Sequence, residues 1–271
     1  MTLIKVAVAG VRGRMGSQVV NGILENETME LVAGFDLSGV GDEIAPGVKV
    51  SSPDDMEDVL NAVNAEVYVD FTNAAAAVAN VKLAARNNLK LVIGTTGFSE
   101  QQYKEMEDAI KVPAIISPNF SIGVNVFWKL IAEAAQHLHA YKYHMELIEM
   151  HHSHKKDAPS GTALKAAGIL SEASGVGADR LVYGRQGITG ERTDDEIGIH
   201  SVRAGDIVGD HTVLYAGIGE RLEITHRAHS REAFALGAVK AIEWISGKDE
   251  SGIYSMDDMM RERESSRLSS E

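Results

Sequence analysis

The chain contains no cysteine among its 271 residues. This absence excludes disulfide bonds and thiolate chemistry, including thiol-dependent aldehyde oxidation, and it leaves His, Asp and Glu as the side chains for a metal site. A sequence without cysteine suits a reducing compartment. We therefore expect the protein to act in the cytoplasm.

Long apolar runs are also missing. No segment approaches the roughly 20 apolar residues that a membrane-spanning helix needs, and residues 1–6 lead directly into a strand-like pattern, so we expect neither membrane insertion nor secretion. Basic residues are few: 26 Lys and Arg stand against 39 Asp and Glu, and the formal net charge is −13. Since binding to nucleic acid depends on neutralising phosphates, no nucleic-acid partner is expected.

The composition is otherwise that of a globular enzyme, with 44% hydrophobic and 24% charged residues, and the length allows two modest domains. The first half of the chain repeats strand-like and helix-like segments. This alternation predicts an α/β fold with a Rossmann-like, doubly wound parallel sheet that has helices on both faces. The predicted strands and helices cover residues 3–9, 17–24, 31–35, 65–72, 74–88, 90–94, 99–110 and 113–117.

A turn with three glycines at residues 10–16 follows the first predicted strand and precedes a predicted helix. Asp36 ends the second strand about 20 residues beyond the turn, where a dinucleotide fold places the acid that binds the ribose hydroxyls. This context favours a nucleotide site, and the alternative is a tight turn without a ligand. Arg12 and Arg14 could supply cationic contacts to phosphate. In such a sheet, ligands lie beyond the carboxyl ends of the strands, where we also find Thr72, 94–97 and 118–121.

The pattern changes after Ser121. A longer helix follows Gly123, and its expected apolar face contains Phe127, Leu130, Ile131, Ala134 and Leu138. Strand-like segments and one more helix then predict a second α+β domain with a mixed or antiparallel sheet; they cover residues 144–150, 161–174, 198–204, 211–216 and 221–228.

A final helix at residues 231–245 is expected to return to the first domain, and the polar residues 261–271 are expected to be frayed. We therefore assign residues 1–122 and 231–271 to a dinucleotide-binding domain. Residues 123–230 are assigned to substrate binding and oligomerisation.

Three histidines and two lysines reverse the sign of the charge locally; they are His151, His152, His154, Lys155 and Lys156. Residues 159–162 follow and are typical of a helix start, which favours a nearby anion by roughly 0.3–1 kcal/mol. Backbone N–H groups and hydroxyls of residues 160–162 could therefore bind a carboxylate. The histidines and lysines could transfer protons or pair with an anion.

Each of these features also has a structural interpretation. A lysine pair commonly forms a solvated face, a histidine at a strand end can be a structural hydrogen-bonding group, and residues 160–162 could be an ordinary helix cap. The pattern His-His-x-His could also donate nitrogens to a metal ion. We expect no metal site, because the cluster has no acidic ligand of its own and the adjacent lysines oppose a cation.

Together, seven motifs resemble the 4-hydroxy-tetrahydrodipicolinate reductase family, also called dihydrodipicolinate reductase, of the diaminopimelate route to lysine. The histidine-lysine segment and its Pro-Ser-Gly-Thr sequel are highly specific, whereas the glycine turn is shared with many dehydrogenases. The motifs are GVRGRMG at 10–16, DFT at 70–72, GTTGF at 94–98, NFSIGVN at 119–125, EMHHSHK at 149–155, DAPSGTA at 157–163 and SVRAGDIVG at 201–209.

The resemblance implies roles for individual residues. His151 is implied as the acid/base and Lys155 as the proton donor, while His152, Gly161 and Thr162 are implied to bind the carboxylates of the substrate. The implied contacts to NADH or NADPH are Gly10, Val11, Arg12, Gly13, Arg14, Met15, Asp36, Gly94, Thr95, Thr96, Ser117, Pro118, Asn119 and Phe120.

In the family, a hydride passes from the nicotinamide to a cyclic, unsaturated dicarboxylate, and water is lost overall. A small dicarboxylate substrate agrees with the cationic segment, and the reduction calls for a proton donor. Leu37 follows Asp36 where family members that use NADPH often carry a basic residue, so NADH is expected to be at least an equal partner. The resemblance also implies a homotetramer built through the sheet of the second domain.

Two other functional classes are compatible with the residues. The first half alone would permit a nucleotide-sensing module without turnover. The same plan could also serve a different oxidoreductase, such as one acting on an aldehyde or a keto acid. A substrate panel separates these hypotheses from the reductase.

Overall fold

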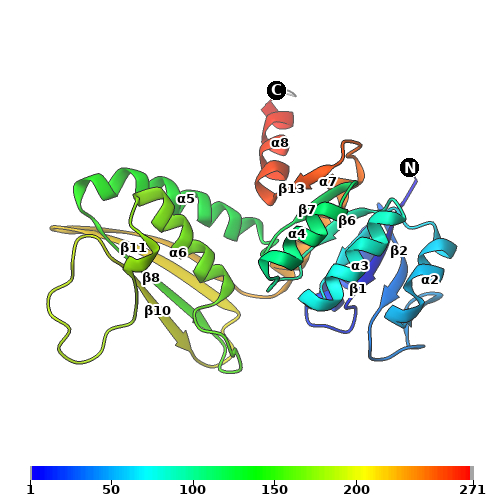
Figure 1. The fold of residues 1–271 in the computed structure, drawn as a ribbon, viewed down its shortest axis with the longest axis horizontal. Coiled ribbons are helices and arrows are strands. Elements are labelled where there is room, and N and C mark those ends of the chain that lie inside the picture. Colours follow the sequence, from blue (N-terminus) through cyan, green and yellow to red (C-terminus); the bar gives the residue numbers. More distant parts are fainter. Residues whose placement is uncertain (1, 269–271) are drawn as a thin grey trace. The chain divides into compact units, whose positions relative to one another are not determined.

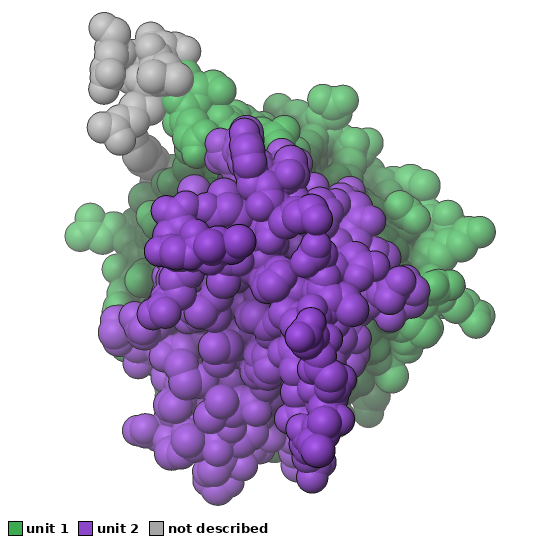
Figure 2. All heavy atoms as spheres, turned by 90° about the vertical axis from the view of Figure 1, so that its left-hand side faces the viewer, with its two compact units in different colours: residues 1–122, 232–271 green, residues 123–231 purple. Residues whose placement is uncertain are grey.

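The structure is a computed structural model that describes residues 2–268. The chain divides into two compact units, which Figure 2 shows in different colours. Unit 1 contains the chain up to Ile122 and again from Glu232, and unit 2 contains Gly123–Arg231. The prediction of a Rossmann-like parallel sheet plus a second sheet of mixed orientation is confirmed.

Unit 1 is an alternation of strands and helices, as its sequence pattern predicts. Its elements are β1 (Ile4–Ala9), α1 (Gly16–Leu24), β2 (Met29–Phe35), β3 (Glu43–Ala45), β4 (Val48–Ser51), η1 (Pro53–Asp55), α2 (Met56–Val63), β5 (Val67–Asp70), α3 (Ala74–Arg86), β6 (Lys90–Ile93), α4 (Glu100–Ala109), β7 (Pro113–Ile116), α7 (Glu232–Ser246), β13 (Gly252–Tyr254) and α8 (Met256–Leu268) (Figure 1).

The sheet of unit 1 has the strand order β13-β7-β6-β5-β1-β2-β4-β3, and its pairs are parallel except for β3 with β4. The order reverses at β1, from which the chain proceeds first to β2 and later to β5. Successive residues of β1 point to opposite faces, so Val6 and Val8 enter one apolar cluster while Ala7 and Ala9 enter the other. Both faces are therefore buried under helices, as a parallel sheet requires.

The helices α1, α7 and α8 contribute to the first cluster, and α2, α3 and α4 contribute to the second. The expectation that the helix near residue 231 returns to the first domain agrees with this packing, because Ala238, Ala241 and Ile245 of α7 are buried in the first cluster. The carboxyl ends of β1, β2, β5, β6 and β7 consequently meet at one edge of unit 1.

Unit 2 is built around a five-stranded sheet with the order β12-β11-β8-β10-β9. The strands β8, β10 and β9 are parallel to one another, and β11 is antiparallel to both β8 and β12. The helix α5 begins at the last residue of unit 1 and continues into unit 2. The elements are α5 (Ile122–Leu138), η2 (His139–Tyr141), β8 (His144–His151), α6 (Gly161–Ser174), η3 (Ala178–Arg180), β9 (Leu181–Tyr183), β10 (Ile197–Arg203), β11 (Gly209–Gly217) and β12 (Glu220–Ala228).

One face of this sheet is covered by α5 and α6 (Figure 1). Along β8, every second residue points to that face and is buried: Met145, Leu147, Glu149 and His151. The helix α6 has the predicted bounds, and its buried stripe consists of Ala163, Ala166, Ala167 and Leu170. The apolar face expected for α5 is partly wrong. Leu130 is 47% exposed, while Val124, Trp128 and Ala135 are buried instead.

The C-terminal segment also corrects an expectation. Residues 261–268 were expected to be frayed, but they continue α8, and residues 269–271 lie outside the described part. Ion pairs hold this polar helix, because Glu262 pairs with Lys248, Arg263 with Glu243 and Arg261 with Asp257.

Candidate functional site

A pocket of about 270 Å³ lies at the carboxyl ends of β1, β2 and β5 in unit 1. Three of the predicted cofactor residues, Gly10, Gly13 and Asp36, line it. Sequence reasoning did not single out most of the other lining residues, although Thr72 was placed at this edge. The full lining is Ala9, Gly10, Gly13, Phe35, Asp36, Leu37, Pro53, Met56, Phe71, Thr72, Asn73, Ala76 and Asn80.

The glycine turn has the shape that a dinucleotide site needs. Gly10 has φ +81°, and a Cβ there would lie 2.5 Å from the carbonyl oxygen of Phe71. A Cβ on Gly16 would lie 2.0 Å from the carbonyl oxygen of Gly10, so α1 begins in direct contact with the turn. The backbone therefore closes tightly between β1 and β5, and the N-terminus of α1 points its positive dipole end at this edge.

Asp36 is held at the end of β2 by the turn itself. Its Oδ2 accepts the backbone N–H of Arg12 at 2.9 Å, and its Oδ1 accepts the N–H of Ser38 at 3.0 Å and the hydroxyl of Ser38 at 2.9 Å. Partial burial raises the pKa of Asp36, but these hydrogen bonds bring its pKa below the ordinary value. Asp36 is thus a fixed carboxylate in the pocket, suited to ribose hydroxyls.

The sequence suggested that Arg12 could make a cationic contact to a phosphate, but the charge of its side chain is already paired. Its guanidinium forms an ion pair with Asp42 in the loop after β2. Leu37, the residue after Asp36, is 85% exposed and lines the pocket. Arg14 is exposed, Val11 is buried, and Met15 occupies the N-cap position of α1 without a capping hydrogen bond from its side chain.

The other predicted cofactor residues follow β6 and β7. Gly94 lies so close to Phe71 that a Cβ would be 2.1 Å from its ring, and Phe71 in turn packs edge-on against Phe120, with 5.9 Å between ring centroids. Buried Asp70 joins these loops: its Oδ1 accepts the hydroxyls of Thr72 at 2.6 Å and Thr95 at 2.7 Å. The structure brings these residues to the same edge as the pocket.

The loop after β7 is ordered by its own polar groups. The hydroxyl of Ser117 donates to the carbonyl oxygen of Asn119 at 2.8 Å, and the N–H of Ser121 donates to Oδ1 of Asn119 at 2.9 Å. Pro118 and Thr96 are exposed at this edge. None of the predicted residues in the loops after β6 and β7 lines the pocket.

In unit 2, the polar residues Glu149 and His151 continue the buried face of β8. The Glu149 carboxylate is fully buried and pairs with Arg203 of the neighbouring strand β10. Burial would raise the pKa of Glu149, but hydrogen bonds from His151 and Arg203 hold its pKa far below the ordinary value. His151 is 9% exposed and contacts Oε2 of Glu149 through Nδ1.

The loop after β8 carries the remaining predicted cations. Lys155 Nζ lies 3.0 Å from Oδ1 of Asp157, and its side chain is 21% exposed. Burial raises the pKa of Asp157, but the Lys155 ammonium brings its pKa below the ordinary value. The rings of His152 and His154 lie 6.3 Å apart, and Lys156 is exposed.

The start of α6 is a capped helix N-terminus. Ser160 is an ordinary N-cap, because its Oγ accepts the N–H of Ala163 at 3.1 Å, and its own N–H donates to Glu149 at 3.2 Å. Ser160 is therefore used within the protein and is not the carboxylate ligand that the sequence allowed. Gly161 and Thr162 form the first turn behind it, and no atom lies within 4 Å of a Cβ built on Gly161.

Sequence reasoning missed His211 of β11. Its ring stands edge-on to that of His151 with 5.3 Å between centroids, and its Nε2 lies 3.2 Å from Oγ of Ser160. Burial, followed by the neighbouring His151, lowers the pKa of His211 to about 3. The imidazole of His211 is therefore neutral at physiological pH.

This buried neutral histidine predicts acid sensitivity of unit 2. Between pH 6.5 and about 3 the unfolded chain binds a proton at residue 211 that the folded chain does not, so stability falls as the pH falls. We expect a loss of about 2 kcal/mol between pH 7 and 5 that is absent in His211→Asn. The variant keeps only a smaller pH dependence of its stability. This remainder comes from His226, because burial lowers the pKa of His226 as well.

Urea unfolding at both pH values measures the effect. Of the two tryptophans, Trp128 lies in unit 2 and Trp244 in unit 1, so fluorescence in a Trp244→Phe background follows unit 2 alone. The carboxylates with strongly lowered pKa values add to the acid sensitivity only below pH 4.5. Equal pH dependence of the two proteins would contradict a neutral, buried His211.

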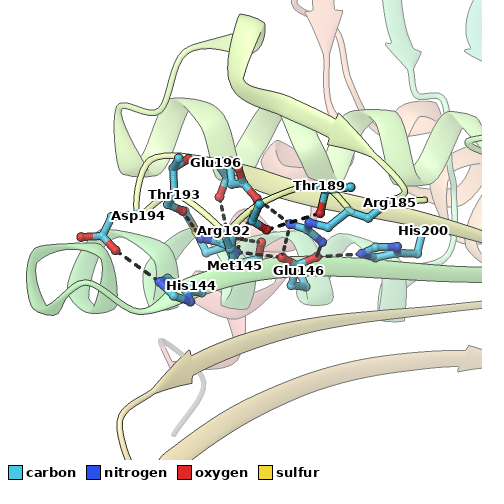
Figure 3. A network of polar contacts seen from close by, with 11 residues as sticks. His144, Met145, Glu146, Arg185, Thr189, Arg192, Thr193, Asp194, Glu196 and His200 are labelled. Atoms are coloured by element: carbon cyan, nitrogen blue, oxygen red, sulfur yellow. Dashed lines mark hydrogen bonds and ion pairs between the residues drawn. The ribbon is translucent and has the colours of Figure 1, made fainter. Parts of the chain in front are cut away.

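A second carboxylate on β8 offers a contrast. Glu146 points to the face opposite Glu149 and is bound by Arg185, Arg192 and His200 (Figure 3). Burial would raise the pKa of Glu146, but these hydrogen bonds lower it to about 2. This network binds the segment between β9 and β10 to the sheet. It lies away from the cationic residues 151–156.

Residues 2–268 contain neither a metal-binding cluster nor a membrane-spanning helix. No group of three or more His, Asp or Glu side chains has the arrangement of a metal centre in this part of the chain. Within the same residues, no helix is both long and apolar enough to cross a bilayer.

A doubly wound sheet with a glycine turn and an acid at its edge, joined to a second unit with a buried histidine and a cationic loop, defines a dinucleotide-dependent oxidoreductase. Models of the dihydrodipicolinate reductase N-terminus and C-terminus match residues 4–120 and 123–260. The chain belongs to the dihydrodipicolinate reductase family, and the resemblance noted in the sequence is confirmed. Members of this family are NAD(P)H-dependent oxidoreductases.

Curated relatives match over nearly the full length. The 4-hydroxy-tetrahydrodipicolinate reductase of Methanosarcina barkeri is 51% identical over 268 residues, which is 95% of this chain and 99% of the relative. That of Methanocaldococcus jannaschii is 50% identical over 271 residues, or 95% and 97% of the two chains. Among solved structures, dipicolinate-bound dihydrodipicolinate reductase from Paenisporosarcina sp. TG-14 has a TM-score of 0.75 and 30% identity, covering 94% of this chain and 98% of that one.

Proposed function

We propose that this chain reduces 4-hydroxy-tetrahydrodipicolinate to tetrahydrodipicolinate with NAD(P)H and loss of water, in the diaminopimelate route to lysine. The observation that carries the proposal is the cationic loop at residues 151–156, which joins the end of β8 to the start of α6 in a member of this family. A doubly negative ring is the ligand that such a combination of imidazole, ammonium and helix-start N–H groups favours.

Unit 1 is the dinucleotide-binding domain in this proposal, and its residues fit that ligand. The turn at 10–16 binds the pyrophosphate, and Asp36 accepts hydrogen bonds from the ribose hydroxyls. The loops at 94–96 and 117–120 contact the rest of the NAD(P)H molecule. The tight glycine cradle and the pocket beside Asp36 support this assignment. When bound, NAD(P)H supplies a hydride to the unsaturated ring of the substrate.

Unit 2 binds the dicarboxylate. His152 and the first turn of α6 at Gly161 and Thr162 hold the carboxylates, where the helix dipole adds to the attraction. The electron pair displaced by the hydride takes up one proton, which Lys155 donates with His151 as the acid/base. The contact of Lys155 Nζ with Oδ1 of Asp157 at 3.0 Å supports this role, because it holds the ammonium within the loop that follows His151.

Consumption of NADH tests the activity. Incubation with the hydroxy-dicarboxylate should remove the absorbance of reduced nicotinamide, one equivalent per equivalent of substrate. If NADH binds but is not oxidised in the presence of the hydroxy-dicarboxylate, the nucleotide-sensing alternative replaces the proposal. Oxidation with an aldehyde or a keto acid, but not with the dicarboxylate, would identify a different oxidoreductase.

The preference between the two nicotinamide cofactors follows from the pocket in unit 1. Asp36 is a carboxylate that repels a 2′-phosphate, Leu37 offers no charge, and Arg12 is already paired with Asp42. We expect a dissociation constant for NADH no weaker than that for NADPH. Asp36→Ala should weaken NADH binding by roughly 10–100-fold, because one hydrogen bond to a charged group is lost. The same substitution should weaken NADPH binding much less.

Fluorescence titration of the protein with each nucleotide measures both constants without turnover. Asp42→Asn serves as a comparison, because it releases Arg12 without changing Asp36 and should improve NADPH binding alone. A strong preference of the wild type for NADPH would overturn the role given to Asp36.

We also propose a cytoplasmic homotetramer. The face of the unit 2 sheet opposite α5 and α6 carries the half-buried or exposed apolar side chains Ile148, Met150, Val202 and Leu214. A sheet face with several apolar side chains is commonly buried against another layer, here a second copy of the chain. Light scattering should give four times the mass of 29.2 kDa, and cell fractionation checks the location.

A further inference from the structure

Glu149 is a buried carboxylate of unit 2, and each of its two oxygens has two hydrogen-bond partners. Its side chain is 0% exposed, and the guanidinium of Arg203 grips both oxygens, Nη1 with Oε2 at 2.9 Å and Nη2 with Oε1 at 2.7 Å. The N–H of Ser160 donates to Oε1 at 3.2 Å, and Nδ1 of His151 lies 2.5 Å from Oε2. A buried carboxylate with this set of donors acts only as an acceptor.

The tautomer of His151 follows from this arrangement. Because Glu149 can only accept, Nδ1 of His151 must carry the hydrogen between them, and in the neutral ring Nε2 is then the atom with a lone pair. Glu149 thus selects which nitrogen of His151 can exchange a proton with a ligand.

Gly209, the first residue of β11, determines the surroundings of that nitrogen. A Cβ on Gly209 would lie 3.0 Å from Nε2 and 3.4 Å from Cδ2 of His151. Any side chain at this position would press on Nε2. The glycine has an ordinary φ, so the need for it at this place is spatial and not conformational.

Arg203 has a second set of contacts. Its Nη2 donates to the carbonyl oxygen of Asp157 at 2.5 Å, and the next residues of the chain bind the start of the same loop, with Ala204 N–H on His151 O at 2.9 Å and Ser153 N–H on Gly205 O at 3.1 Å. The end of β10 therefore holds both ends of the loop that carries Lys155.

We propose that Glu149 and Arg203 are positioning residues of the reaction: Glu149 fixes the Nδ1–H tautomer of His151 so that Nε2 exchanges the proton, and Arg203 holds Glu149 and the Lys155 loop in register. The role in turnover rests on the proposed function, whereas the tautomer does not. Gly209 keeps Nε2 accessible.

The test is Glu149→Gln, which keeps the size of the side chain. The amide oxygen can still accept from Arg203, so its NH₂ group faces Nδ1 of His151 and requires the opposite tautomer. We expect ¹⁵N NMR of labelled histidine to show the hydrogen moved to Nε2, and kcat to fall by about 10²–10⁴-fold, with NADH affinity unchanged.

Glu146→Gln is the matched control. It lies on the same strand and, like Glu149, is bound by arginine and histidine side chains, here Arg185, Arg192 and His200, but on the other face of the sheet. It should leave the tautomer of His151 and kcat unchanged. If Glu149→Gln folds poorly, Gly209→Ala gives an independent check, because it should lower kcat by crowding Nε2 while the hydrogen stays on Nδ1.

The outcomes distinguish the positioning of His151 from the proposed reductase activity. A Glu149→Gln protein that keeps the hydrogen on Nδ1, or turns over like wild type, overturns the proposal. If Gly209→Ala turns over like wild type, Nε2 is not the exchanging atom and the proposal also fails. Failure of the wild type to oxidise NADH, with the tautomer shift still present, would refute the proposed function and leave the positioning of His151 supported.

Discussion

Replacing His151 by glutamine is expected to lower kcat by about 10²–10⁴-fold, which is the usual effect of losing a general acid or base. The glutamine amide can still donate to Glu149, so the buried carboxylate keeps its third partner, but an amide cannot take up and release a proton as an imidazole does. Steady-state kinetics with NADH and the hydroxy-dicarboxylate measure the loss. The dissociation constant for NADH should not change, because the proposed cofactor contacts all lie in unit 1.

A histidine outside the site is the control for this substitution. His137 is exposed on α5 in the same unit, and His137→Gln should turn over like the wild type. Undiminished kcat in His151→Gln would reject His151 as the acid/base and would shift attention to Lys155 alone.

Replacing Lys155 by methionine should have a comparable effect, a fall in kcat of about 10²–10⁴-fold, since the variant has no ammonium to donate the proton. Methionine preserves most of the length and the apolar stem of lysine. The side chain is largely buried beside Asp157, so the loss of its charge also leaves that carboxylate without its partner. We therefore expect dipicolinate to bind more weakly to this variant, in addition to the slower turnover.

Lys142 offers a close comparison for Lys155. It also pairs with an aspartate, Asp194, at 3.3 Å in unit 2, but its side chain is 78% exposed. Lys142→Met should leave kcat and dipicolinate binding unchanged. Wild-type turnover in Lys155→Met would show that the proton comes from another group.

Much of the fold could be predicted because hydropathy and glycine placement determine it locally. The helix α6 shows this best, since Ser160 caps it, Gly175 ends it with φ +76°, and the alanine stripe between them faces the sheet. Short elements such as β3, β9 and β13 were not predicted, because three residues carry no periodic pattern.

Polar contacts account for the larger errors in the predicted fold, which concern α8 and α5. The helix α8 is held by ion pairs of Glu262 and Arg263 with residues in and just after α7, which a hydropathy pattern does not reveal. On α5, Trp128 is buried under Lys165, whose Nζ lies 4.5 Å from the ring centroid. That contact depends on how α5 and α6 pack, so the sequence of α5 alone could not indicate which face is buried.

The residues of the candidate site also differ in how far the sequence alone reveals them. Residues at strand ends, such as Gly10 and Asp36, could be found because motifs and spacing mark them. Arg203 and Gly209 stand in the SVRAGDIVG motif, but neither they nor His211 were given a role, because they meet β8 only through the strand order, in which β10 and β11 flank β8. One signal was available for Glu149: it is a charged residue at an alternating position whose neighbours Met145 and Leu147 are apolar.

In the proposed reaction, this chain moves a hydride from a nicotinamide to the dicarboxylate ring. Mass spectrometry of the product formed with NADH deuterated at the transferable position of the nicotinamide tests it most directly. The account predicts tetrahydrodipicolinate that carries one deuterium, formed by the wild type and nearly absent with His151→Gln. Product without deuterium, or no product while both NADH and dipicolinate bind, would contradict it.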